Sequence, residues 1–177
     1  MMKTILIVLC LTMFPAAMYS QCDWDKSSGK DPFTGLVTRA TVWENIVRST
    51  SGSVSFKIVE FPQDTSIYLY VKVSLPQNVS SIRCFNDESL IMLKSGEIVK
   101  SLDFEDDEVD CGTILINSCE LTPEMIEFLK QNPIEMFRIV FAEGQKDFTI
   151  LDPDRKRQPE YYQMKADYFI RTLKCFE

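Results

Sequence analysis

Histidine is absent from all 177 residues of this chain. Without an imidazole, the chain alone cannot assemble a Ser-His-Asp or a Cys-His catalytic arrangement, and zinc sites that contain histidine are excluded as well. A Cys-x-x-Cys motif, which dithiol redox chemistry favours, is also absent from the sequence. These absences favour a non-catalytic domain, or an enzyme that works without histidine.

Positive charge is scarce, because 19 Lys and Arg residues face 26 Asp and Glu residues and leave a net charge of −7. An acidic domain repels phosphate backbones, so nucleic acid is not expected as a partner. No segment after residue 20 is long and apolar enough for a transmembrane anchor. We expect no cofactor, and we expect a protein or a glycan as the partner.

The first twenty residues have the pattern of a signal peptide. Lys3 supplies the positive charge, an apolar core runs from Thr4 to Phe14, and small residues lead to Ser20. The sequence therefore predicts a signal peptide over 1–20 and a single globular domain over 21–177, in the periplasm or outside the cell. A lipid anchor through Cys22 is an alternative, although Gln before it makes a poor lipidation signal.

Five cysteines follow the predicted signal peptide, and an exported protein keeps its disulfides. We expect Cys22 to bond Cys175, because both lie near the ends of the domain and the ends of a domain are often close together. Cys111 is not expected to bond Cys119, because a strand between them would hold them about 26 Å apart. The pairing among Cys84, Cys111 and Cys119 stays open.

Hydrophobic periodicity predicts an α+β domain with a mostly antiparallel sheet and two main helices, about 122–131 and 159–174, packed on it. Thr122 and Pro123 are typical of a helix start. The strand–helix–strand pattern over 113–142 suggests a crossover that joins parallel strands, and the stretch 41–49 fits a helix or a strand. Strands are expected at 54–61, 67–75, 89–94, 97–104, 113–118, 134–142 and 147–151.

The segment 21–40 is interpreted as an N-terminal latch with a turn at GKDPFTG. In this interpretation Asp31 brackets the turn and Phe33 packs against the body of the domain. Asp23, Asp25 and Asp31 also match part of a calcium-loop count, but the glycine and the glutamate that the loop requires are missing. They are therefore weak metal candidates.

A possible contact surface comes from one strand face, on which Tyr68, Tyr70 and Lys72 alternate with apolar residues. This face is a surface if water reaches it and part of the core if a helix covers it. The acidic run over 103–110 is expected to be solvated, with weak cation binding as an open alternative. The basic run Arg155-Lys156-Arg157 is expected to be a solvated connection.

The chain resembles an uncharacterised family of exported bacterial proteins. The likeness rests on Gln21-Cys22, on Asp31-Pro32-Phe33-Thr34-Gly35, on the segment Leu121 to Phe141 with Arg138, and on Leu173-Lys174-Cys175. It implies an exported globular domain and assigns no catalytic residue.

The leading functional hypothesis is thus a non-catalytic binding or structural protein of the cell envelope or the exterior. The alternative is a small enzyme of the glycan-hydrolase type, which needs only two carboxylates at a defined separation.

Overall fold

The computed structural model describes residues 22–49, 52–76, 83–105, 110–150 and 159–177. The predicted signal peptide and its cleavage site lie outside these residues, as does the basic run 155–157. Strands dominate the described part of the chain, and every strand pair in it is antiparallel. The expected α+β class with a mostly antiparallel sheet is confirmed.

The larger sheet has the strand order β1-β2-β4-β5-β10, and β3 also pairs with β4. β2 and β3 pair with opposite ends of the same edge of β4, so the ambiguous stretch 41–49 leads into a strand. The strands are β1 (Gly29–Lys30), β2 (Val37–Ala40), β3 (Glu44–Ser49), β4 (Gly52–Phe61), β5 (Ser66–Ser74) and β10 (Ile114–Glu120).

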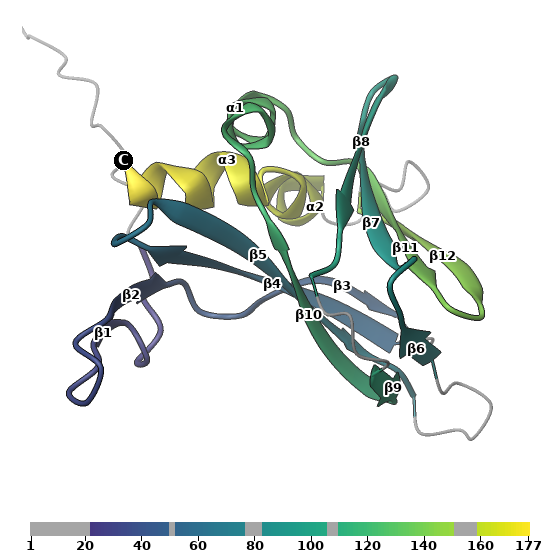
Figure 1. The fold of residues 1–177 in the computed structure, drawn as a ribbon. Coiled ribbons are helices and arrows are strands. Elements are labelled where there is room, and N and C mark those ends of the chain that lie inside the picture. The colour runs from purple at the N-terminus through teal and green to yellow at the C-terminus, as the bar shows by residue number, and fades with distance from the viewer. Residues whose placement is uncertain (1–21, 50–51, 77–82, 106–109, 151–158) are drawn as a thin grey trace, which may run out of the picture.

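A smaller sheet with the order β12-β11-β7-β8 stands beside the larger one (Figure 1). Gly96, at a φ of 55°, forms the tight turn between β7 and β8 that the sequence predicts. The strands are β7 (Leu90–Ser95), β8 (Ile98–Asp103), β11 (Met136–Phe141) and β12 (Gly144–Thr149); β6 (Arg83–Phe85) and β9 (Asp110–Gly112) form a separate pair.

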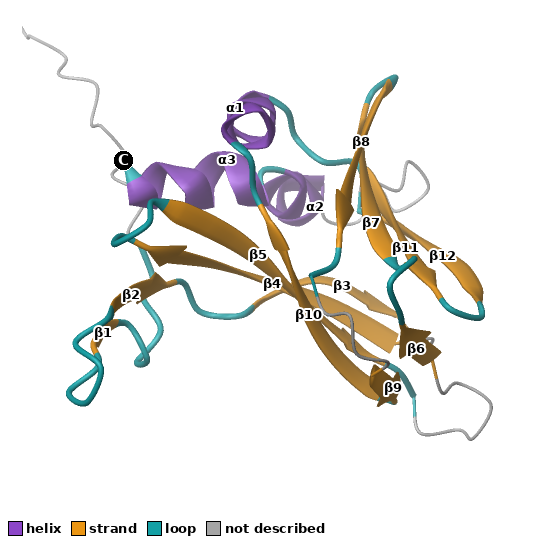
Figure 2. Ribbon diagram, viewed as in Figure 1, coloured by secondary structure: helices purple, strands orange, loops and turns teal. Residues whose placement is uncertain are grey.

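The helices α1 (Pro123–Gln131), α2 (Pro159–Ala166) and α3 (Tyr168–Thr172) lie over one face of the larger sheet, and a 3₁₀ turn, η1 (Leu173–Phe176), ends the chain (Figure 2). α1 begins as predicted, since Thr122 Oγ1 accepts a hydrogen bond from Met125 N at 3.3 Å. The expected helix over 159–174 is divided at Asp167. The Ala166 carbonyl accepts from Ile134 N instead of continuing one regular helix.

The expected parallel crossover over 113–142 is wrong. β10 belongs to the larger sheet and β11 to the smaller one, so α1 connects two sheets instead of two neighbouring parallel strands. The apolar sequence of β11 predicts a central strand, and β11 does lie between β12 and β7 in the smaller sheet.

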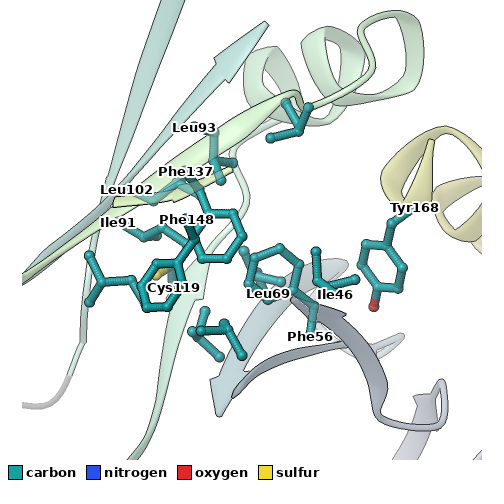
Figure 3. Packing of buried hydrophobic residues seen from close by; sticks show 14 of the residues in the cluster. Ile46, Phe56, Leu69, Ile91, Leu93, Leu102, Cys119, Phe137, Phe148 and Tyr168 are labelled. Carbon is teal, nitrogen blue, oxygen red and sulfur yellow. The ribbon is translucent and has the colours of Figure 1, made fainter. Parts of the chain in front are cut away.

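One hydrophobic core joins both sheets and the helices. Figure 3 shows Phe56 of β4 between Phe137 of the smaller sheet and Tyr168 of α3. The ring centroids lie 5.2 Å apart for Phe56 and Phe137 and 5.8 Å apart for Phe56 and Tyr168, within the range of favourable aromatic pairs. This shared packing fixes the position of β4 and β5, and thereby of their opposite face.

Candidate binding face of the larger sheet

The side chains of β5 alternate between the core and the opposite face of the larger sheet, here called the outer face. Leu69, Val71 and Val73 are completely buried, whereas Tyr68, Tyr70 and Lys72 are partly exposed. The structure therefore brings the three predicted contact residues into one row on the outer face.

Neighbouring strands extend this row. Tyr70 pairs with Lys57 on β4 and with Ser118 on β10, and Lys72 pairs with Ile116. Ile114 and Ile116 are 63% and 45% exposed, so water reaches the outer face at β10.

Trp43 lies at the junction between β2 and β3, yet its ring reaches the lysines of β4 and β5. Lys72 Nζ lies 4.8 Å from the ring centroid and Lys57 Nζ lies 5.9 Å from it, both within cation–π range. The sequence analysis missed Trp43, because it lies in the stretch whose conformation was ambiguous. The sequence feature that could have identified Trp43 is its position beside strands that carry lysine at outward positions.

Charge is unevenly distributed along the outer face. Arg48 pairs with Ser53 on the same face as Lys57 and Lys72, and one carboxylate, that of Asp25, lies 3.2 Å from Lys57 Nζ. We call Trp43, Arg48, Lys57, Tyr70 and Lys72 the basic end. It is locally positive on a chain whose net charge is −7.

The other end of the row is acidic. Tyr68 pairs with Glu120 of β10, and the pKa of the Tyr68 hydroxyl is raised by burial and then by the charges of Glu105 and Glu120. The predicted contact surface thus divides into a basic end at Lys72 and an acidic end at Tyr68, and an anionic ligand would be attracted only to the first.

The two ends of the described chain are clasped together beside the larger sheet. Cys22 and Cys175 form a disulfide with an S–S distance of 2.07 Å, which is the pair that the sequence analysis expects. Trp24 packs edge-on against Phe176 at 5.4 Å, and the Arg39 guanidinium lies over both rings.

Phe33 does not take part in this latch. It is 96% exposed, so the expectation that it packs against the body is wrong. The β1–β2 hairpin forms one end of the larger sheet, and its loop projects away from the other strands (Figure 1). Its turn closes through Asp31, whose carboxylate accepts from Phe33 N and Thr34 N at 2.7 and 2.8 Å, and it needs no apolar anchor.

Two of the three weak metal candidates, Asp25 and Asp31, accept hydrogen bonds within the turns that contain them. Asp25 Oδ1 accepts from the Ser27 backbone and hydroxyl at 2.8 and 2.7 Å, and these bonds, with Lys57, lower the pKa of Asp25 to about 2. Asp23, the third candidate, is exposed. The described residues include no group of three acidic or cysteine side chains placed to hold a metal ion.

The other three cysteines of the described residues are a bonded pair and a free thiol. Cys84 and Cys111 face each other across β6 and β9 and are bonded. Cys119 is free and buried in the core, where burial, then Glu105 and Asp103, raise the pKa of its thiol. In agreement with the prediction, Cys111 does not bond Cys119.

Two cavities in the described part of the chain bear on the enzymatic alternative. One, of about 60 Å³, borders the Cys22–Cys175 disulfide. The buried Tyr168 Oη and Arg171 Nε have no hydrogen-bond partner among the described residues, which suits ordered water. The other, of about 230 Å³, lies on the smaller sheet.

Neither cavity offers the carboxylate pair of a glycan hydrolase. The first is lined by one acidic residue, Asp23, and the second by one, Asp147. The Asp147 carboxylate is engaged by the Arg138 guanidinium, with an Nη2–Oδ2 distance of 2.8 Å. These two cavities therefore do not supply such a pair. Residues 106–109 of the acidic run lie outside the described residues.

Comparisons with models of known protein families, with curated proteins and with solved structures find no match. Among the described residues, no helix has both the length and the apolar character needed to cross a membrane.

Proposed function

We propose that the chain is an exported binding domain that recognises an acidic glycan through the basic end of the outer face. The observation that carries this proposal is the position of Trp43 beside the ammonium groups of Lys57 and Lys72. A ring beside cations suits a ligand that combines a stacking surface with negative charge.

A carboxylated sugar has both features. The apolar face of a pyranose ring can stack on Trp43 or Tyr70, while its carboxylate can pair with Lys72. Lys57 already has Asp25 as its partner, whereas Lys72 has no carboxylate within ion-pair distance among the described residues. Lys72 is therefore the cation most available to a ligand, and Arg48 is exposed at the same end.

Export is supported by the pattern of residues 1–20 and by two cysteine pairs at disulfide distance. Disulfides persist in oxidising compartments, where glycans of the cell surface also lie. We therefore place the proposed ligand in the envelope or outside the cell.

Calorimetric titration with an oligogalacturonate tests this proposal, and its methyl ester is the matched neutral ligand. We expect the acid to bind, the ester not to bind, and affinity to fall as salt rises. Trp43→Ala should weaken binding roughly tenfold, as loss of a stacking contact does, and Lys72→Gln should weaken it severalfold.

Lys94→Gln is the control variant, because it removes one positive charge from the smaller sheet instead. It should bind like the unchanged chain. Equal binding of the ester and the acid, or equal losses in Lys94→Gln and Lys72→Gln, would contradict the proposal.

A further inference from the structure

The smaller sheet ends at β8, whose outer edge is unpaired among the described residues. A two-residue turn joins Ser95 to Ile98, and such a turn is flanked by a hydrogen-bonded pair. Hydrogen-bonded and non-hydrogen-bonded pairs alternate along an antiparallel ladder. The even-numbered residues of β8 therefore bond to β7, and the bond from Phe104 N to Ser89 O agrees with this alternation. Val99 and Ser101 therefore direct their N–H and C=O groups away from β7.

The first two residues of this edge, Ile98 and Val99, lack the polar character that usually protects an edge against another strand. Ile98 and Val99 are 49% and 48% exposed. The opposite edge, β12, carries the polar side chains of Gln145, Lys146 and Asp147 in the corresponding place. Proteins generally keep edge strands polar or covered. The exposed apolar residues on β8 therefore indicate an edge that can pair with another strand.

A cavity of about 230 Å³ adjoins the same strand, and Val99 is one of its lining residues. Lys94 and Met92 of β7 lie opposite Val99 and Ser101, and Met136 continues the apolar floor. Methionine adapts its shape to different apolar side chains, so the cavity suits a side chain that arrives along β8.

Two lysines flank this edge, one on each face of the sheet. Lys94 lines the cavity, and Lys100 has its ammonium 5.7 Å from the Phe128 ring centroid. Neither has a carboxylate within ion-pair distance among the described residues, whereas Arg138 across the cavity is paired with Asp147. The exposed acidic residues of this hairpin, Glu97 in the turn and Asp103 at the far end of β8, lie on either side of the two lysines, so the positive charge is confined to the stretch around Val99–Ser101.

We propose that β8 binds an extended acidic peptide segment of another protein as an additional strand. The backbone of Val99 and Ser101 supplies the hydrogen bonds. An apolar side chain of the peptide covers Val99 and the cavity, and a carboxylate on the opposite face pairs with Lys100. This site is separate from the basic end of the larger sheet, so each can fail without the other.

The test uses the purified chain with both disulfides intact and an end-blocked octapeptide of alternating valine and glutamate. By NMR, binding should shift the amide signals of Val99 and Ser101 and slow their hydrogen exchange. The matched peptide of alternating valine and lysine should not bind. Lys100→Glu should abolish binding, and Lys100→Arg should preserve it.

Ser101→Pro removes an outward N–H and leaves the β7 ladder intact, so it should weaken binding at least tenfold. Gln145→Pro is its control on β12, where Gln145 is also an outward position, the first one after the Ala142–Glu143 turn, as Val99 is on β8. The proposal is overturned if Ser101→Pro binds equally, if the lysine peptide binds equally, or if neither peptide binds at about 1 mM. A dimer of the free chain that Ser101→Pro dissociates would assign the edge to a second copy instead.

Discussion

At the scale of single residues, the outer face depends on the hydrogen bonds that the Asp25 carboxylate accepts. Its carboxylate accepts two hydrogen bonds from Ser27 and one from Lys57 at 3.2 Å. The Lys57 ammonium is thereby held beside Trp43, so an acid of the N-terminal segment helps to position the basic end.

Acid should weaken this arrangement within a defined range. The pKa of Asp25 is lowered from 3.8 to about 2, so its contribution to folding stability is present above pH 4 and is lost as the pH falls towards 2. A carboxyl NMR titration measures this pKa directly. The backbone N–H of Ser27 is the largest cause of the lowered pKa, and Ser27→Ala keeps it while removing the hydroxyl donor. The pKa in Ser27→Ala should therefore rise only part of the way towards 3.8, and an unchanged pKa would contradict the contribution assigned to the hydroxyl.

Cys119 should be chemically inert while the chain is folded. It is completely buried, and burial raises the pKa of its thiol, so the reactive thiolate is scarce. In a chain without residues 1–20, which contain Cys10, a thiol reagent should label the native protein very slowly and label one thiol per chain after unfolding without reductant. Rapid labelling of the native chain would show that the core around Cys119 opens.

At the scale of elements, α1 connects the two sheets, and its start depends on one side chain. Thr122→Ala removes the acceptor for Met125 N and should cost about 1 kcal/mol of unfolding free energy. Urea unfolding measures this loss. Thr122→Ser keeps the hydroxyl and serves as the control, and it should retain most of the stability.

Elements whose signals are local could be predicted from the sequence. The alternation of β5, the Gly96 turn and the Thr122 start each depend on a few neighbouring residues. β11 was placed centrally for the same reason, because its apolar sequence needs a strand on either side.

Elements whose arrangement depends on distant partners could not be predicted. Nothing local distinguishes a parallel crossover from the observed step between two sheets, because that choice depends on which strands meet Ile114–Glu120 and Met136–Phe141. The helix break at Asp167 depends on Ile134, which lies far away in sequence. Trp43 was missed because its lysine partners lie on two other strands.

At the scale of the whole molecule, the Cys22–Cys175 disulfide closes a loop with a sequence separation of 153. In the chain-entropy account a loop of this length stabilises by up to about 5 kcal/mol. Cys22→Ser, Cys175→Ser and the double variant should therefore lose similar amounts of stability in thermal melts. Additive losses would show that the two cysteines act independently.

The same clasp secures Trp24 and Arg39 at the edge of the larger sheet. The outer face itself is fixed from behind by the shared core, through Phe56 and its neighbours on β4 and β5. We therefore expect Cys22→Ser and Cys175→Ser to lower the stability of the fold while the residues of the basic end keep their arrangement in the folded chain.

The most direct test of the proposed glycan site uses the fluorescence of Trp43. The chain has two tryptophans, so Trp24→Phe leaves Trp43 as the reporter. The account predicts that an oligogalacturonate changes this fluorescence saturably, that its methyl ester does not, and that Lys72→Gln shifts the midpoint to higher concentration. A midpoint that is unchanged in Lys72→Gln, or binding of the acid that leaves Trp43 fluorescence constant, would contradict it.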